Sequence, residues 1–377
     1  MAQAQARQIL FVTGTRADFG KLEPLALAAR DAGFRVSFFV TGMHMMERYG
    51  LTKIEVHRLQ GVEVFEFENQ AEDDPQDMIL ARTITGFSAF VADHQPDLVV
   101  VHGDRVEALA AALVCATNYL RCAHIEGGEV SGTIDEIFRH CNTKLSTYHF
   151  VSSEVAKSRV QALGEVADSI YVTGSPELDT HRAASGVSME QVRQHYDIDF
   201  DDYGIVTFHP VTSEQDSIGA QARALFDRLV ASGRHFVVIL PNNDPGANDI
   251  VQVINTLPND RFRVLPSMRF AYFSELLKNA AAHIGNSSVG VREAPFLGLP
   301  SLDIGTRQNK RSNAGSISHC SAHDGQAIDD FLAQKWGKRH DSDSGFGAGS
   351  SAQLFVDILK DQKFWQHPLQ KEFQDLG

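Results

Sequence analysis

Short apolar runs alternate with longer amphipathic stretches through the first half of the chain. The runs are rich in β-branched and aromatic residues, and the stretches between them have the length and periodicity of helices. This order is typical of β-α-β units, which build a parallel, doubly wound sheet. The expected strands are residues 9–12, 36–40, 62–67, 98–101, 123–125, 149–151 and 170–172. The clearest helices between them are expected at residues 22–32, 77–94 and 106–118.

The same pattern restarts in the second half of the chain. A helical stretch around residues 189–195 and an acidic turn at residues 199–202 connect the two halves. The strands expected after this connection are residues 205–208, 236–240, 262–265, 283–284 and 301–304. A chain of 377 residues also exceeds what one hydrophobic core usually fills. We therefore predict two α/β domains, residues 1–174 and 175–361.

The C-terminal region departs from this pattern. Residues 337–351 are poor in apolar side chains and rich in Gly and Ser, which predicts a mobile loop. Two helical pieces are expected after it, at residues 352–360 and 369–376.

Composition narrows the class of protein. Apolar residues make up 43% and charged residues 22%, which is ordinary globular usage. The formal net charge of -14 disfavours a broad nucleic-acid surface, although local Arg and Lys can still bind a small phosphate. No apolar run approaches the roughly 18 residues that a membrane span needs, and residues 1–7 carry no leader-like apolar core. We expect a cytoplasmic protein with no nucleic-acid or membrane partner.

The cysteines give no sign of a metal site. Cys115, Cys122, Cys141 and Cys320 form no C-x-x-C pair and no Cys/His cluster with zinc spacing. Reduced, mostly buried thiols are expected, with no metal and no cofactor.

Three acidic residues follow directly after predicted strands or open the next helix: Asp104, Glu126 and Asp135. In an open parallel sheet such positions share the crevice beyond the carboxyl ends of the strands. Gathered carboxylates are costly unless protonated, paired or used, and their mutual repulsion separates their pKa values into an acid and a base. The alternative is that Arg105 and Arg139 neutralise them as structural ion pairs. Spacing alone leaves both interpretations open.

A glycine turn, Thr13-Gly14-Thr15-Arg16, links the first strand to a helix. The free N-H groups of a helix start favour an anion, and Arg16 would add a fork of donors. The turn is not G-x-G-x-x-G, and no acid clearly ends the second strand to hold a ribose, so dinucleotide binding is weakly supported. A purely structural turn is the alternative.

A second anion site is predicted in the second domain, where Gly285-Asn286-Ser287-Ser288 leads from a strand into a helix. Backbone amides with the hydroxyls of Ser287 and Ser288 would cradle a diphosphate. Glu293, one turn further, could accept from ribose hydroxyls. The alternative is a capped helix with a solvent-facing Glu293.

Three more polar residues follow strands of that domain. Arg307 could complete the anion site, and His209, held in a loop by Pro210, could meet phosphate or act as a general acid. Asn242 could bind a hydroxyl together with Asp244. A surface arginine, an exposed histidine and an Asx turn explain them equally well.

Taken together, several segments resemble the UDP-N-acetylglucosamine 2-epimerase family, and most closely its hydrolysing branch, which releases UDP and N-acetylmannosamine for sialic acid synthesis. The matching segments are TGTRADFG, VHGDR, HIEGG, FHP, PNNDPG, NSSVGVREAPFLGLP and IGTRQ, spread in order over about residues 8 to 315. The resemblance implies a GT-B-like fold, with two Rossmann-like doubly wound domains and an interdomain cleft. It also implies that the C-terminal helix within residues 362–377 returns to the first domain.

The resemblance assigns roles by position. Asp104, Glu126 and Asp135 would be the catalytic acids, with His209 helping at the diphosphate. The residues that would hold the nucleotide are Arg16, Asn242, Ser287, Ser288, Glu293 and Arg307. Lys310 stands where relatives usually have glycine, which bears on the loop beside the uridine. The implied partners are a small-molecule UDP-sugar and a second copy of the chain in a homodimer.

The family chemistry explains why carboxylates are needed. The C2 proton of the sugar is not activated by a carbonyl, so its removal accompanies loss of UDP from C1 and gives a 2-acetamidoglucal. Water then adds across the double bond while an acid returns a proton to C2. Which acid performs which step is left open. The alternatives are a non-hydrolysing 2-epimerase, a hydrolysing epimerase of a UDP-2,4-diacetamido-6-deoxy sugar, a GT-B glycosyltransferase, and a nucleotide-sugar sensor with silent acids.

Overall fold

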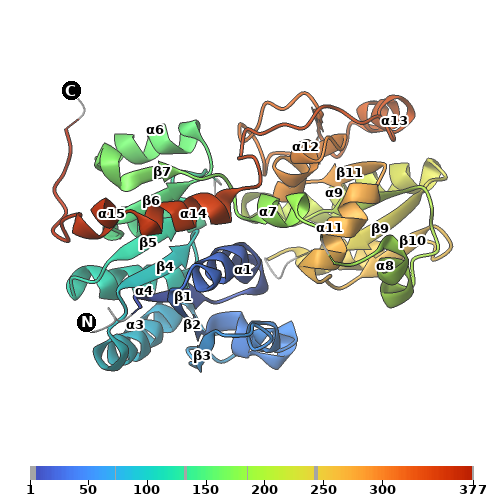
Figure 1. The fold of residues 1–377 in the computed structure, drawn as a ribbon. Helices are drawn as coiled ribbons and strands as arrows, with labels where there is room; N and C mark the ends of the chain where they lie inside the picture. The colour runs from blue at the N-terminus through green and yellow to red at the C-terminus, as the bar shows by residue number, and fades with distance from the viewer. Residues whose placement is uncertain (1–5, 73, 131–133, 185, 242–244, 376–377) are drawn as a thin grey trace. The chain divides into compact units, whose positions relative to one another are not determined.

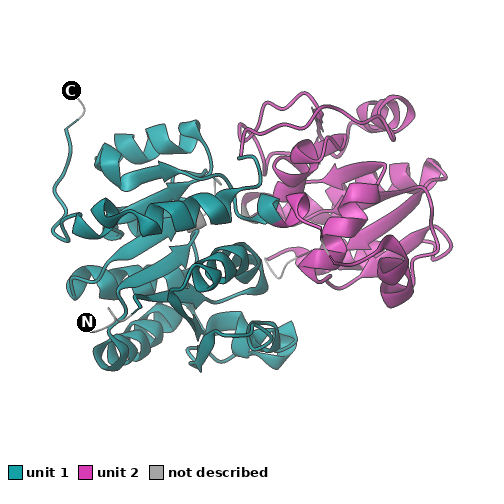
Figure 2. Cartoon of the chain, viewed as in Figure 1, with its two compact units in different colours: residues 1–179, 347–377 teal, residues 180–346 magenta. Residues whose placement is uncertain are grey.

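A computed structural model describes residues 6–72, 74–130, 134–184, 186–241 and 245–375, with the side chains of residues 134, 135 and 212 left outside the description. The chain forms two compact units (Figure 2). Unit 1 comprises Met1–Asp179 and Gly347–Gly377, and unit 2 comprises Thr180–Phe346. The predicted arrangement of two doubly wound α/β domains is confirmed.

Unit 1 is built on a seven-stranded parallel sheet in the order β3-β2-β1-β4-β5-β6-β7 (Figure 1). The strands are β1 (Gln8–Thr13), β2 (Arg35–Val40), β3 (Glu63–Glu66), β4 (Leu98–His102), β5 (Cys122–Ile125), β6 (Tyr148–Val151) and β7 (Ile170–Val172). Ile9 pairs with Val36 of β2 on one side and with Leu98 of β4 on the other. The strand order therefore reverses between β1 and β4, which is where ligands bind in such sheets.

Both faces of this sheet are buried, which explains the continuous apolar runs. Ile9 and Phe11 enter one core with residues of α1 (Arg16–Asp31) and α14 (Ser351–Lys360). Leu10 and Val12 enter another core on the opposite face with residues of α3 (Gln76–His94) and α4 (Val106–Thr117). Further helices of unit 1 are α2 (Lys53–Val56), α5 (Ile134–Leu145), α6 (Glu154–Ala162) and α15 (Gln362–Gln366), and α7 (Glu177–Arg182) crosses from unit 1 into unit 2.

Unit 2 has a six-stranded parallel sheet in the order β10-β9-β8-β11-β12-β13. Its strands are β8 (Tyr203–Thr207), β9 (His235–Ile239), β10 (Phe262–Leu265), β11 (Ala282–Gly285), β12 (Ser301–Ile304) and β13 (Ile317–Cys320). Its helices are α8 (Met189–Tyr196), α9 (Gln215–Ala231), α10 (Ala247–Ile254), α11 (Phe270–Asn279), α12 (Glu293–Phe296) and α13 (Gly325–Gln334). The strand order of this sheet reverses between the adjacent strands β8 and β11.

Four details differ from the sequence expectations. The first helix starts at Arg16, because Thr15 caps it with a capping box. The edge strand β13 was not expected, since its side chains are half-buried or exposed and carry little apolar signal. Gly347–Lys360 belongs to unit 1, although it was assigned to the second domain. Residues 371–375 are not helical, and α15 lies before them instead.

The segment predicted as a mobile loop is pinned by hydrogen bonds. Arg339 Nη2 donates to the carbonyls of Lys278 and Ala280 at 2.7 Å, and His340 N donates to Gly298 O at 2.8 Å. Ser342 Oγ donates to Phe296 O at 2.6 Å. A segment poor in apolar residues is therefore ordered by polar contacts to backbone, which composition does not reveal.

The C-terminal tail is tied to unit 1 by Lys371. Its ammonium pairs with Glu165 Oε2 at 2.6 Å and donates to Lys144 O at 2.8 Å and to Ser146 O at 2.6 Å. Glu165 also accepts from Lys144 and from His149, and its side chain is only 2% exposed. Burial alone raises the pKa of Glu165, but His149, Lys371 and Lys144 outweigh it and lower the pKa to about 2.

This depressed pKa makes a testable link between pH and stability. Because the folded-state pKa lies below the ordinary value of 4.5, the stabilisation is fully present above pH 4.5 and is lost as the pH falls toward 2. We expect Glu165→Gln to lower the free energy of unfolding of unit 1 by about 3 kcal/mol at pH 7, since the ammonium groups of Lys144 and Lys371 lose their carboxylate. The difference in free energy of unfolding between Glu165→Gln and the wild type should become smaller as the pH falls from 4.5 toward 2.

Denaturant unfolding, followed by Trp365 fluorescence in a chain whose other tryptophan, Trp336 of unit 2, is replaced by Phe, measures this difference. Glu154→Gln, which changes an exposed residue at the start of α6, should leave stability unchanged at every pH. A Glu165→Gln effect that is the same at pH 3 and pH 7 would contradict the assignment.

Candidate active site

Asp104 lies just beyond β4, after a turn whose backbone is held by hydrogen bonds from two buried side chains. Gly103 has a left-handed backbone, with φ of 65°, and its carbonyl accepts from His124 Nε2 at 2.8 Å and from Asn142 Nδ2 at 3.0 Å. Burial lowers the pKa of His124 to about 3, so this imidazole is a neutral donor at pH 7. The turn thus sets the position of the carboxylate that follows it.

The carboxylate of Asp104 accepts a hydrogen bond from Arg139 Nη2 of α5. The ion pair that sequence reasoning kept as an alternative is therefore present. The side chain of Asp104 nevertheless stays 23% exposed, so it is not sealed inside the pair.

Glu126 follows β5 and combines burial with backbone strain. Its φ is 63°, a left-handed conformation that costs a non-glycine residue free energy, and the residue is 4% exposed. Its Oε2 lies 2.8 Å from Lys21 Nζ and 3.1 Å from His102 Nε2, and its Oε1 accepts from Ser175 Oγ. Lys21 of α1 therefore forms an ion pair with Glu126, which the sequence did not signal.

Sequence reasoning missed a second buried carboxylate in this network, that of Glu177. It lies at the start of α7 (Glu177–Arg182), is 2% exposed, and contacts both Lys21 Nζ and Ser175 Oγ at 2.8 Å. No motif marked it, because its charged partner, Lys21, comes from a distant part of the chain.

Two predicted site residues cannot be placed in full. Asp135 lies in the first turn of α5, one residue after the helix begins, but its side chain is outside the description. Asn242, with Asp244, lies outside the described residues.

The turn before α1 offers fewer free amides than its sequence suggested. Gly14 N and Thr15 N both donate to the carboxylate of Asp18, at 3.0 and 3.1 Å, so these two groups are used internally. Arg16 Nη2 pairs with Glu55 Oε1 at 2.6 Å, while 35% of the Arg16 side chain is exposed. Anion binding by Arg16 stays a prediction.

In unit 2 the structure brings His209, Ser287 and Arg307 to the ends of β8, β11 and β12. Asn286 Oδ1 accepts from His209 N at 2.7 Å and Asn286 Nδ2 donates to His209 O at 2.8 Å, which locks the two loops together. Asn286 O in turn accepts from Arg307 Nη1 at 3.2 Å and from Gln308 Nε2 at 2.8 Å. Asn286 therefore organises three loops at the strand ends.

The helix expected after Ser287 is much shorter than predicted. Ser287 caps a 3-10 turn, Ser288–Gly290, and α12 that follows spans only Glu293–Phe296. An anion here would thus meet individual amides and hydroxyls more than a helix dipole, because the dipole of so short a helix is small.

Glu293 is held inside unit 2. It is 7% exposed and its Oε2 lies 2.8 Å from His181 Nε2, while His181 Nδ1 lies 2.9 Å from Ser274 Oγ of α11. The alternative of a solvent-facing Glu293 is therefore wrong. His181, on α7, is a further residue that the sequence did not signal.

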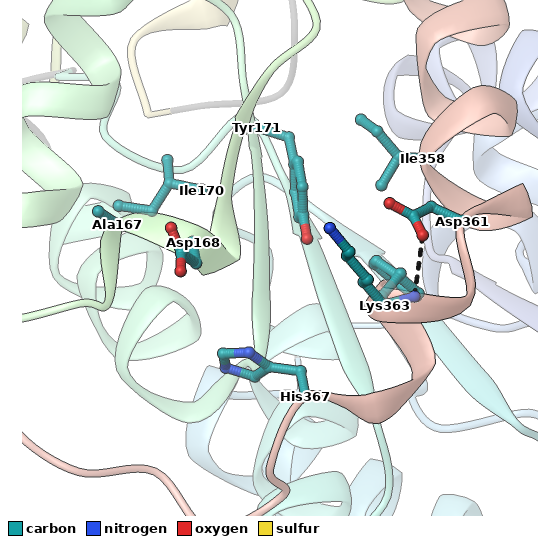
Figure 3. A pocket seen from close by; sticks show the side chains of 9 residues that line it. Ala167, Asp168, Ile170, Tyr171, Ile358, Asp361, Lys363 and His367 are labelled. Atoms are coloured by element: carbon teal, nitrogen blue, oxygen red, sulfur yellow. Dashed lines mark hydrogen bonds between the residues drawn. The ribbon is translucent and has the colours of Figure 1, made fainter.

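A cavity of about 560 Å³ lies elsewhere in unit 1, beside β7 and the junction of α14 and α15 (Figure 3). Its walls include Asp168, Tyr171, Asp361 and His367, and none of the predicted site residues. Burial raises the pKa of Tyr171 to about 12, and Asp361 is used as the cap of α15, where it accepts from Lys363 N at 2.9 Å. We interpret this cavity as part of the helix junction.

Two observations concern the described residues only. They contain no group of three or more His, Cys, Asp or Glu side chains that could hold a metal ion. Within the same ranges, none of the helices has both the length and the apolarity needed to cross a bilayer. The four cysteines are free, with Cys115 and Cys122 buried and the other two half-buried.

Comparison with known proteins identifies the family. Residues 26–360 match the family described as UDP-N-acetylglucosamine 2-epimerase, and the chain belongs to it. A UDP-N-acetylglucosamine 2-epimerase from Neisseria meningitidis serogroup B is 40% identical over 376 residues, which cover 98% of this chain and all of the relative. A UDP-N,N'-diacetylbacillosamine 2-epimerase (hydrolyzing) from Legionella pneumophila is 33% identical over 318 residues, covering 82% of this chain and 84% of the relative.

The fold is shared with solved structures. A crystal structure of UDP-GlcNAc 2-epimerase from Neisseria meningitidis bound to UDP-GlcNAc gives a TM-score of 0.80 at 18% identity, over 93% of this chain and 99% of that one. This likeness confirms the predicted GT-B-like class of two parallel-sheet α/β domains.

The close approach of Gly285, at the end of β11, to the neighbouring strand β8 can be tested by substitution. Gly285 has φ of 137°, and a Cβ there would lie 2.1 Å from Thr207 O of the neighbouring strand. We expect Gly285→Ala to lower the free energy of unfolding of unit 2 by about 3 kcal/mol, from strain and a backbone clash. Gly315→Ala is the matched control, since a Cβ there meets nothing within 4 Å.

Unfolding is followed by Trp336 fluorescence in a chain whose Trp365 is replaced by Phe. Equal stability of the two alanine variants would show that the β8 and β11 ends are not packed as described.

Proposed function

We propose that this protein is a hydrolysing UDP-N-acetylglucosamine 2-epimerase, which converts UDP-N-acetylglucosamine and water to N-acetylmannosamine and UDP for sialic acid and capsule synthesis. The observation that carries the proposal is Glu126, a buried carboxylate on a strained backbone at the end of a central strand. Strain and burial of this kind persist where function requires them. Relatives named as 2-epimerases, one of them as hydrolyzing, support the same reaction.

The first step is an elimination. The bond from C1 to the UDP oxygen breaks, the C2 proton passes to a carboxylate of unit 1, and a 2-acetamidoglucal is left. Asp104, Glu126 and Asp135 are the groups proposed for proton transfer. Arg139 and Lys21 favour the ionised forms of Asp104 and Glu126, which suits a base.

The second step is a hydration. Water adds its hydroxyl to C1 and passes its other proton to an ionised carboxylate. A protonated carboxyl gives a proton to C2 on the face opposite to the one that lost its proton, which yields N-acetylmannosamine. A pair of acids in different environments can serve as base and acid in turn. No metal or cofactor is needed for either step.

Unit 2 is proposed to bind UDP. The amides and hydroxyls of Ser287 and Ser288, with Arg307, would hold the diphosphate, and His209 beside them would stabilise charge on the leaving group. Glu293, fixed by His181, would accept hydrogen bonds from the ribose hydroxyls. Arg16 and Asn242 complete the proposed nucleotide contacts.

A second candidate substrate is a UDP-2,4-diacetamido-6-deoxy sugar. The relative from Legionella pneumophila, named for UDP-N,N'-diacetylbacillosamine, is the observation that favours it. The chemistry at C1 and C2 would be the same, and only the groups that meet C4 and C6 would differ.

Incubation with UDP-N-acetylglucosamine in deuterated water tests the reaction. We expect free UDP and N-acetylmannosamine that carries deuterium at C2, both measured by NMR. Release of UDP-N-acetylmannosamine would indicate a non-hydrolysing epimerase, and turnover without deuterium at C2 would indicate glycosyl transfer. Turnover confined to the diacetamido sugar would select the second candidate.

Asp104→Asn provides the control for this experiment. It should release no UDP while binding UDP with the wild-type dissociation constant, because Asp104 lies in unit 1 and the proposed diphosphate site lies in unit 2. Wild-type turnover by Asp104→Asn would defeat the catalytic assignment.

The His181 contact predicts an effect on binding. Phe at position 181 removes the donor to Glu293, so the carboxylate loses its fixed orientation toward the ribose. We expect His181→Phe to raise the UDP dissociation constant about tenfold, the value of one hydrogen bond to a charged group, in calorimetric titration. His195→Phe, at an exposed histidine of the same unit, should change nothing. Unaltered affinity in His181→Phe would remove Glu293 from the proposed site.

A further inference from the structure

His102 lies at the end of β4, beside the buried carboxylate of Glu126. Its Nε2 lies 3.1 Å from Glu126 Oε2, which is within hydrogen-bond distance. β4 and β5 pair in parallel, with His102 opposite Ile125, the residue before Glu126. The register of the sheet therefore brings the imidazole next to the carboxylate.

The imidazole is more exposed to water than the carboxylate that it contacts. The side chain of His102 is 13% exposed, whereas that of Glu126 is 5% exposed. His102 Nδ1 has no hydrogen-bond partner among the described residues, and it is not one of the polar atoms that are sealed from water. One nitrogen of the ring thus meets Glu126, and the other is open to solvent.

The proposed reaction requires protons to enter and leave its carboxylates. In the elimination one carboxylate takes the C2 proton, and in the hydration a protonated carboxyl gives a proton up. Each group has to return to its starting protonation state before the next turnover. A carboxylate as enclosed as that of Glu126 exchanges protons with water slowly unless a neighbouring group carries them.

The three neighbours of Glu126 described above differ in their ability to carry a proton to solvent. Lys21 Nζ is an ammonium group, which has donors and no acceptor. The hydroxyl of Ser175 is fully buried, so it does not lead to solvent. A neutral imidazole accepts a proton at one nitrogen and releases one from the other near neutral pH. His102 combines this chemistry with an opening to water.

We propose that His102 is the proton shuttle of Glu126. When Glu126 holds the C2 proton, its Oε2–H bond breaks as the proton binds His102 Nε2, which leaves a carboxylate and an imidazolium. The imidazolium then releases its Nδ1 proton to water or to a buffer base. The reverse sequence reloads Glu126 when it has to act as an acid.

This inference rests on the proposed function for the role of Glu126 toward the sugar. His102 acts on the reaction through Glu126 and is assigned no contact with the substrate. Loss of His102 should therefore lower kcat, while the KM for the UDP-sugar and the dissociation constant of UDP stay unchanged.

Chemical rescue tests the shuttle. His102→Ala removes the proton carrier and leaves a space of imidazole size, so we expect kcat at neutral pH to fall about 100-fold, within the range that a proton-transfer group contributes. Free imidazole in the buffer should raise the kcat of His102→Ala about tenfold, because it restores a proton carrier at the same place. Pyrazole has a ring of the same size but is not a base at neutral pH, and it should raise kcat not at all.

A second variant, His102→Gln, separates proton transfer from a structural role. Glutamine keeps an N-H that can donate to Glu126 Oε2 but cannot carry a proton, so its kcat should fall as in His102→Ala. His195→Phe, at an exposed histidine of unit 2, should keep the wild-type kcat with and without imidazole. Calorimetric titration with UDP, in which each variant should bind with wild-type affinity, shows that the variants are folded.

The outcomes separate the shuttle from the proposed function. Wild-type kcat in His102→Gln, or an equal response of His102→Ala to imidazole and to pyrazole, would overturn the shuttle while the epimerase reaction still stood. Absence of turnover by the wild type on every UDP-sugar would instead defeat the proposed function, and the shuttle with it.

Discussion

The structure depends on pairing each buried carboxylate with a cation or a hydrogen-bond donor. Parallel strands deliver their following residues to one edge of the sheet, and in unit 1 the residues delivered are acids. Without partners, buried acids would be protonated or would destabilise the fold. Arg139 serves Asp104, and Lys21 serves Glu126 and Glu177 together. The network that makes burial tolerable also holds each carboxylate in a fixed orientation, which is what acid–base chemistry needs.

A single short helix takes part in both candidate sites. α7 begins in unit 1 with Glu177, inside the Lys21 network, and ends in unit 2, where His181 orients Glu293. Between them, Asp179 accepts from Ser351 N at 2.9 Å and from Ala352 N at 2.7 Å and so fixes the start of α14. The helix at the unit boundary therefore connects the two units and also carries residues that contact proposed site residues in each of them.

Much of the fold could be predicted from the sequence, because apolar runs buried on both faces of a parallel sheet leave a strong signal. The strand ends that carry Asp104, Glu126, His209 and Ser287 follow from the same signal. What could not be predicted are pairings across long separations: Lys21 lies 105 residues from Glu126, and His181 lies 112 residues from Glu293. Such contacts depend on topology, and a polar residue gives no local sign of its partner. For a related reason composition misjudged residues 337–351, where the side chains of Arg339 and Ser342 donate to backbone carbonyls of other segments.

The most direct test of the central claim is a crystal structure of the protein with UDP and N-acetylmannosamine bound. The account predicts that the sugar ring contacts the carboxylates of Asp104 and Glu126 and that the diphosphate contacts the amides of Ser287 and Ser288. A ring bound out of contact with both carboxylates, or a diphosphate held away from the ends of β8 and β11, would contradict it.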